Sequence, residues 1–123
     1  MNAALVVFLG GGLGSLFRYG ISKASLYYFS SSFPLGTFLA NILSCVLLAV
    51  VILLFHFKAN TELKALQLFL ITGFCGGLST FSAFSFETMT LLKNQMWGLA
   101  VFNVGLSLLV GIAAMYFILL KTN

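Results

Sequence analysis

Apolar residues dominate the chain in four long stretches that are separated by short polar segments. The stretches cover residues 3–28, 34–57, 65–92 and 96–120. Each is at least as long as the roughly 20 residues that a helix needs to cross the hydrocarbon core of a bilayer. The pattern therefore predicts an all-α membrane protein in which residues 1–123 form a single four-helix transmembrane domain.

The third stretch contains a polar, glycine-rich interruption between Gly73 and Ser85. Adjacent glycines, Gly76 and Gly77, precede four hydroxyl residues that begin at Ser79, and this composition weakens a helix. Non-helical backbone persists at membrane depth only where protein covers it or where it lines an aqueous cavity. We therefore expect a break in this helix, whose freed carbonyls suit a hard cation such as Na⁺. The alternative is close helix packing through the small residues.

Composition narrows the function classes. The chain is 61% hydrophobic and only 7% charged, against about 25% charged residues in ordinary soluble domains. This excludes a soluble domain and a disordered chain. His56 has no nucleophile or carboxylate pair nearby, so no enzyme is predicted, and Cys45 and Cys75 are interpreted as apolar packing residues. The net charge of +4 comes from basic residues scattered singly, which does not predict nucleic-acid binding.

Basic residues are divided evenly between the two ends of the predicted helices. The end that carries both termini has three, and the opposite end has three if Arg18 counts as flanking or two if Arg18 lies in the membrane. They are Lys58, Lys64 and Lys121 at the first end, and Arg18, Lys23 and Lys93 at the second. Because an excess of Lys and Arg in short loops sets orientation, this balance favours a protein that inserts both ways and pairs with its inverted copy. The alternative is an orientation fixed by a partner.

Several uncharged groups inside the stretches are candidates for an ion path. Phe81 and Phe84 are three residues apart, and ring edges together with Ser and Thr hydroxyls can host a small anion. Spacing alone favours simple core packing for these rings. Asn41 and Asn103 are amides at membrane depth, where they must bond across helices or line a solvated path. Ser107 shares a helical face with Asn103.

Two formal charges also fall within the stretches. Arg18 and Glu87 are functional candidates because charges inside a membrane are costly, and snorkelling to the headgroups is the alternative. The glycines near the start of the first stretch, with Gly10 four residues before Gly14, are interpreted as close helix contacts.

Taken together, three motifs resemble the fluoride channel family of the Fluc/CrcB type. The first stretch has Gly11-Gly12-Leu13-Gly14-Ser15-Leu16-Phe17-Arg18-Tyr19, and the second has Pro34-Leu35-Gly36-Thr37-Phe38-Leu39-Ala40-Asn41. The third has Gly73-Phe74-Cys75-Gly76-Gly77-Leu78-Ser79-Thr80-Phe81-Ser82, the stretch most diagnostic of that family. The chain departs from the family at Ser79 and Ala83, where threonine is common.

The resemblance implies an antiparallel, dual-topology homodimer in the plasma (inner) membrane that exports cytoplasmic fluoride by passive electrodiffusion. It also implies a structural, untransported Na⁺ held by the backbone carbonyls of Gly76 and Ser79. The implied fluoride pathway comprises Asn41, Thr80, Phe81, Ser82, Phe84, Asn103 and Ser107. Arg18 and Glu87 would then act electrostatically or line a vestibule.

Two other functions were weighed. Small multidrug antiporters are also short, four-span and dual-topology, but they need a carboxylate in the first span, and residues 3–28 contain no Asp or Glu. An accessory subunit of a larger membrane complex would have packing motifs but no ion path. The hydroxyl and aromatic cluster argues against this function, but less strongly than the missing carboxylate argues against the antiporter.

Overall fold

The computed structural model describes residues 2–56 and 63–120, which are helical throughout apart from short connections. Four segments of this described part are long and apolar enough to cross a membrane. They are Ala3–Tyr28, Leu35–Phe55, Lys64–Lys93 and Trp97–Leu119. The fold class expected from the sequence, an all-α protein with four membrane-spanning helices, is confirmed, and the chain is a multi-pass membrane protein.

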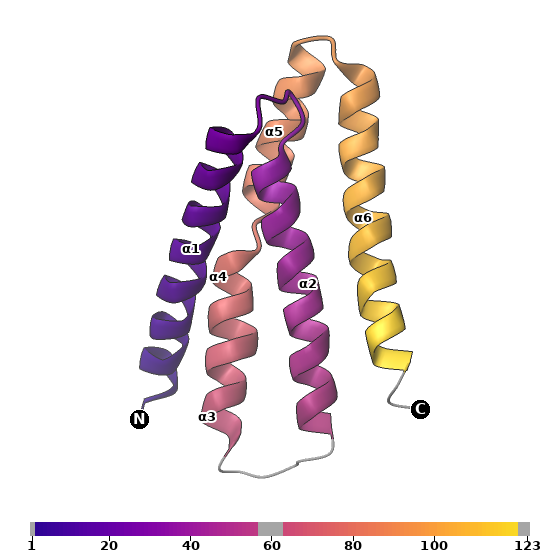
Figure 1. The fold of residues 1–123 in the computed structure, drawn as a ribbon. Helices are drawn as coiled ribbons and strands as arrows, with labels where there is room; N and C mark the ends of the chain where they lie inside the picture. The colour runs from indigo at the N-terminus through magenta and orange to yellow at the C-terminus, as the bar shows by residue number, and fades with distance from the viewer. Residues whose placement is uncertain (1, 57–62, 121–123) are drawn as a thin grey trace.

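The helices run alternately up and down (Figure 1). The first is α1 (Ala3–Tyr28) and the second is α2 (Leu35–His56). The third span is divided among α3 (Lys64–Gln67), η2 (Leu68–Cys75), α4 (Gly76–Leu78) and α5 (Phe81–Lys93). The last helix is α6 (Trp97–Leu119). The start of α1 and the end of α6 lie at the lower end of the bundle in Figure 1, opposite the α1–α2 and α5–α6 connections.

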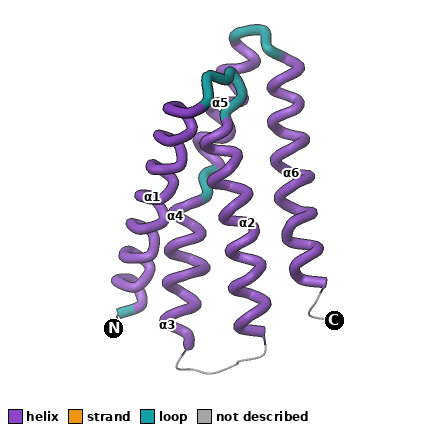
Figure 2. Tube along the Cα trace, viewed as in Figure 1, coloured by secondary structure: helices purple, strands orange, loops and turns teal. Residues whose placement is uncertain are grey.

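The expected break in the third span is present. Ser79 and Thr80 are extended and separate α4 from α5, which is the short loop within the third span in Figure 2. The preceding segment η2 is a π-helix, which no sequence pattern had predicted. π-helical turns are rare and frequently lie beside functional sites. The third span is therefore irregular over about half of its length.

Glycines allow α1 to lie directly against η2 and α4. A Cβ atom added at Gly10 would collide with the carbonyl oxygen of Phe69, and one at Gly14 with that of Phe74. A Cβ atom at Gly77 would meet the carbonyl oxygen of Gly11. The small-residue spacing in the sequence therefore corresponds to backbone-to-backbone contact, the form of packing that membrane helices favour. Close packing and a helix break, offered as alternatives for the glycines of the third span, both occur there.

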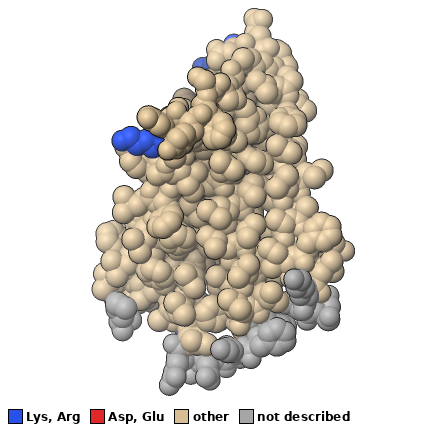
Figure 3. Space-filling view, in the orientation of Figure 1, with Lys and Arg blue, Asp and Glu red and all other residues tan. Residues whose placement is uncertain are grey.

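Most of the surface is apolar. Figure 3 shows one face on which residues other than Lys, Arg, Asp and Glu cover nearly the whole molecule, and the few basic side chains lie toward one end. Large hydrophobic side chains are exposed on α1, α5 and α6, among them Phe8, Phe86 and Phe117. A lipid bilayer accommodates such a surface, whereas water does not.

Candidate functional site: the break in the third span

The backbone of Thr80 leaves the helix and is held by a side chain of α2. Asn41 Oδ1 accepts a hydrogen bond from Thr80 N at 2.7 Å, and Asn41 Nδ2 donates to Thr80 O at 3.4 Å. The amide of Asn41 thus pairs with the backbone of Thr80 as a neighbouring strand would. Since an unpaired backbone group at membrane depth costs several kcal/mol, Asn41 is the group that makes the break tolerable.

The carbonyls of Gly76, Gly77, Leu78 and Ser79 lose their usual helical donors at this break, and Arg18 replaces the donor of Gly77 O. In a continuous helix Thr80 N would donate to Gly76 O, and Ala83 N would donate to Ser79 O. Instead Thr80 N donates to Asn41, and Ala83 N donates to the Thr80 hydroxyl at 3.2 Å. Gly76 and Ser79 are the residues whose carbonyls the resemblance implies as Na⁺ ligands, and hard cations bind such oxygens.

Gly76 also offers room for a ligand. It is exposed on the surface of the chain, and a Cβ atom added there would meet nothing within 4 Å. Among the residues that the structure describes, no group of three or more His, Cys, Asp or Glu side chains lies close enough to hold a metal ion. The freed carbonyls are oxygens of the kind that hard cations bind.

The neighbouring carbonyl of Cys75 is fully engaged by contrast. It accepts hydrogen bonds from Ser79 N at 3.0 Å, from Ser79 Oγ at 3.0 Å and from Ser44 Oγ at 2.9 Å. Ser44 is buried on α2 and was not among the predicted residues. Its signal in the sequence was a hydroxyl three positions after Asn41 in an otherwise apolar span, which has to find a partner in the membrane.

Arg18 of α1 binds the backbone just before the break, on the side opposite Asn41 of α2. Its Nε donates to Gly77 O at 3.1 Å, which ties the middle of α1 to the last turn before the break. A cation near the C-terminal end of a helical segment is stabilised by the dipoles of that segment. Arg18 is half-buried, so its charge is held beside the backbone of Gly77.

Phe81 and Phe84 lie beside each other where α5 begins. Their ring centroids are 6.1 Å apart with the planes tilted by 37°. Phe81 is 80% exposed, so its ring is free of the core packing that spacing alone had favoured for it. The hydroxyls of Thr80 and Ser82 are 3.2 Å apart at the same place. The structure thus brings together two rings and two hydroxyls that were predicted to line an ion path.

Asn103 and Ser107 belong to a separate chain of hydrogen bonds. Asn103 is only 1% exposed, donates from Nδ2 to Thr88 Oγ1 at 3.0 Å, and accepts from Ser107 Oγ at 3.4 Å. Thr88 in turn donates to Phe84 O at 2.8 Å. These bonds join α6 to α5 and reach the backbone of one of the two rings. Thr88 was missed because a threonine one helical turn after Phe84 has no distinguishing sequence signal.

Glu87 lies further along α5, and its partner there is not Arg18. Thr37 Oγ1 donates to Glu87 Oε1 at 2.7 Å across the space between α2 and α5. Glu87 Oε2 is buried and has no hydrogen-bond partner. Arg18 and Glu87, each predicted to act electrostatically or to line a vestibule, are bound to different groups, Gly77 O and Thr37 Oγ1. The other charges used for the orientation count include Lys58 and Lys121, which lie outside the described residues, as does Phe57 at the expected end of the second span.

Comparisons with known proteins place this architecture among related chains. Residues 5–119 match the profile of the family described as "CrcB-like protein, Camphor Resistance (CrcB)". A protein of Pyrococcus abyssi called "Fluoride-specific ion channel FluC" is 42% identical over 118 residues, which cover 94% of this chain and 92% of that protein. Proteins of the same name from Shewanella baltica OS185 and Maridesulfovibrio salexigens are 45% and 34% identical. The former alignment covers 88% of this chain and 86% of that protein, and the latter 92% and 89%.

Proposed function

Since the chain belongs to the CrcB-like protein family, we propose that it forms a channel that conducts fluoride through the membrane. The observation that carries this proposal is the helix break. It brings amide, hydroxyl and ring-edge groups together inside a membrane span, and Asn41, Thr80, Phe81, Ser82 and Phe84 supply them. The names of the relatives, which cover nearly the whole chain, support fluoride as the ion.

The chemistry of these groups suits fluoride. Moving a small, strongly hydrated anion into an apolar medium costs tens of kcal/mol unless other donors replace its water. Hydroxyl and amide hydrogens and the positive edges of phenylalanine rings replace part of that shell. None of these groups carries a fixed charge. An ion can therefore enter and also leave, which conduction requires.

Asn103 and Ser107 have a supporting part in this proposal. Both are committed to hydrogen bonds in the structure, with Thr88 as the link to α5. They hold the backbone beside Phe84 in place, and the hydroxyls of Ser107 and Thr88 extend the polar line beyond the rings. The Ala83 side chain adds no hydroxyl to this line.

A structural Na⁺ is part of the proposal. The carbonyl oxygens of Gly76 and Ser79 would hold it, because the bonds to Asn41 and Thr80 release both from their helical donors. When bound, the cation adds positive charge that favours anions nearby. Two carbonyls are too few for Na⁺ by themselves, and a second copy of the chain would supply two more.

We further propose an antiparallel homodimer. The start of α1 and the end of α6 lie at one end of the bundle. The basic residues divide three against three between the two ends, or three against two when Arg18, which binds Gly77 O in the middle of α1, is left out. This balance gives the chain no preferred orientation, so two oppositely inserted copies are available to pair. Fluoride then moves down its own gradient, and no exchange for protons is needed, since α1 carries no Asp or Glu.

Liposomes that contain only the purified protein test the function. With potassium fluoride inside, Na⁺ present and valinomycin added so that K⁺ balances the charge, we expect rapid fluoride efflux, while liposomes loaded with potassium chloride lose far less anion. Protein-free liposomes are the control. An absence of fluoride efflux would refute the channel and favour an accessory subunit, and efflux of a cationic drug driven by a proton gradient would favour an antiporter.

A further inference from the structure

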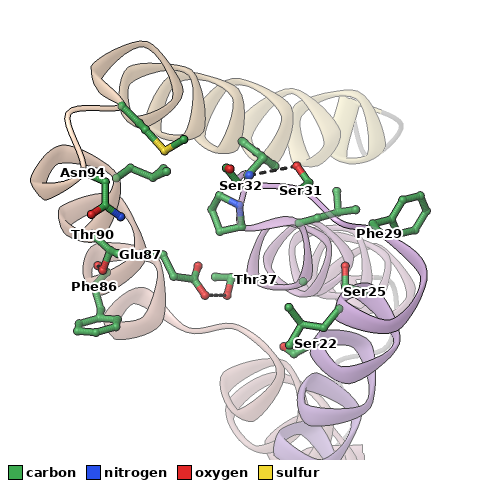
Figure 4. Close-up of a pocket in the computed structure, with 17 residues that line it drawn as sticks. Ser22, Ser25, Phe29, Ser31, Ser32, Thr37, Phe86, Glu87, Thr90 and Asn94 are labelled. Atoms are coloured by element: carbon green, nitrogen blue, oxygen red, sulfur yellow. Dashed lines mark hydrogen bonds between the residues drawn. The ribbon is translucent and has the colours of Figure 1, made fainter.

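A pocket lies outside the helix break, and none of the residues of the proposed fluoride pathway lines it. It has a volume of about 660 Å³ and lies between the last turns of α1, the start of α2 and α5. Figure 4 shows the hydrogen bond that joins Glu87 of α5 to Thr37 of α2, with Ser22 and Ser25 of α1 on the far side of Thr37 from Glu87. Pockets of about 300–1,000 Å³ are the size that holds small organic molecules.

The polar side of the pocket favours a cation. Glu87 is its one charged side chain, and none of the seventeen lining residues is basic. Glu87 Oε2 has no hydrogen-bond partner, and Ser25 Oγ is likewise unpartnered in a residue that is only 8% exposed. The C-terminal ends of α1 and α5 adjoin the pocket at Phe29 and Asn94. The N-termini of α2 and α6 also adjoin it, at Leu35 and Met96, so the helix dipoles nearly cancel and the preference for a cation rests on Glu87.

The other side of the pocket is apolar and aromatic. Phe33, Phe86, Leu91 and Met96 line it together with Leu26 and Phe29. An apolar body, above all an aromatic ring, is favoured against such side chains because phenylalanine rings attract one another edge to face. A ligand that fits both sides therefore carries one positive charge on a short aromatic or alkyl body.

We propose that this pocket is a binding site for small organic ammonium ions with an apolar body. The ammonium group donates hydrogen bonds to Glu87 Oε2 and to the Ser25 hydroxyl, and the body lies against Phe86 and Met96. Glu87 Oε2 is covered in this conformation, so the ligand reaches it after the side chain rotates. Binding relieves a carboxylate oxygen whose burial without a partner is costly.

Occupation of the pocket also has a consequence that rests on the proposed function. Glu87 is on α5, the helix that begins with the two phenylalanines, and the pocket lies at the α1–α2 loop end of that helix. A cation fixed there stands between the rings and that end of the bundle. Ligands of this class therefore block fluoride flux in the channel.

Calorimetric titration of the purified full chain in detergent, without fluoride, tests the site directly. The probe is 2-phenylethylammonium, and the uncharged 2-phenylethanol is its matched control. We expect saturable binding of the amine and binding of the alcohol about tenfold weaker, the loss that follows when a charge-assisted hydrogen bond is removed. Glu87→Gln weakens the amine about tenfold and leaves the alcohol unchanged, whereas Gly12→Ala, on an open part of α1, changes neither.

A second variant keeps the test decisive if Glu87→Gln does not fold. Phe86→Ala should weaken the amine and the alcohol together, because it removes part of the apolar wall that both share. The proposal is overturned if the amine and the alcohol bind equally, or if the unmodified chain shows no saturable binding of the amine. The second result is also expected if another copy of the chain fills the pocket. Since the titration contains no fluoride, its failure is separate from a failure to conduct. Liposomes that release fluoride but are not inhibited by a bound amine overturn the blocking part alone.

Discussion

At the scale of single residues, Asn41 decides whether the third span can be broken. A side-chain amide has one acceptor and one pair of donors, and Asn41 uses them on the N–H and the C=O of the same residue, Thr80. The carbonyl of Gly76 loses its helical donor to this pairing, and the carbonyl of Ser79 loses its own to the Thr80 hydroxyl. One side chain therefore links the stability of the break to one of the proposed Na⁺ ligands.

Replacing Asn41 by leucine tests this link. The shape of the side chain is kept, but both backbone groups of Thr80 lose their partner, and we expect the free energy of unfolding to fall by about 1–3 kcal/mol for each buried group. Denaturant unfolding in detergent micelles measures the change. Asn41→Asp retains the acceptor for Thr80 N and should lose less stability than Asn41→Leu. Equal stability of Asn41→Leu and the unmodified chain would contradict the role of the amide.

The exposed ring of Phe81 is the second decisive residue. Phe81→Ile keeps an apolar side chain but removes the positive ring edge, a loss of about 1.4 kcal/mol that corresponds to a tenfold slower step. We expect fluoride efflux from liposomes to fall by about this factor while dimer assembly, measured by size-exclusion chromatography, is unchanged. Leu109→Ile, on an exposed part of α6, is the control substitution. Unchanged efflux in Phe81→Ile would remove the ring edge from the mechanism.

At the scale of elements, contact between α1 and the third span sets the position of the break. Gly10 and Gly14 face the carbonyl oxygens of Phe69 and Phe74, and Gly77 faces Gly11. Arg18 can reach Gly77 O only because these two backbones lie so close. The glycines thus place the break, and Arg18 and Asn41 hold it from two sides.

A methyl group on this contact should separate the elements. Gly14→Ala places a Cβ atom against the carbonyl of Phe74, and such overpacking typically costs 1–3 kcal/mol. Gly12→Ala has open space around its Cβ and, as a better helix former, should be neutral or slightly stabilising. Thermal unfolding of the two variants side by side gives the comparison. If both lose the same stability, backbone contact at Gly14 is not what joins α1 to the third span.

Sequence reasoning succeeded where a local pattern carries the information. The four spans follow from apolar length, the break from adjacent glycines and hydroxyls, and the α1 contact from the spacing of Gly10 and Gly14. Hydrogen bonds between helices could not be predicted from the sequence, because no local pattern pairs Asn41 with Thr80 or Ser44 with the Cys75 carbonyl. The π-helical turns of η2 likewise have no signal in the residues that form them.

At the scale of the whole molecule, orientation depends on very few charges. Lys23 and Lys93 are exposed, and Lys23 lies 5.6 Å from the centre of the Tyr19 ring. With three basic residues at each end of the sequence-predicted bundle, two added lysines are enough to create an excess. Orientation is thus a property that small changes of sequence can switch.

Charge variants test the antiparallel pairing. Ala3→Lys with Ala4→Lys adds two charges at the end with the termini, and Ser30→Lys with Gln95→Lys adds two at the opposite end. We expect each pair to insert in one orientation only, measured by protease access to a terminal tag, and to lose fluoride efflux when expressed alone. Co-expression of the two should restore efflux. Full efflux from either variant alone, with a single orientation verified, would contradict an antiparallel dimer.

The central claim is that the whole assembly conducts fluoride passively. The most direct test is whether fluoride efflux carries net charge across the membrane. Liposomes containing only this protein are loaded with potassium fluoride, and efflux is followed with and without valinomycin, which lets K⁺ leave. The account predicts fast fluoride efflux only when valinomycin is present, because each fluoride that leaves alone builds an opposing potential. Fast efflux without valinomycin, accompanied by proton movement, would contradict the account and identify a coupled transporter.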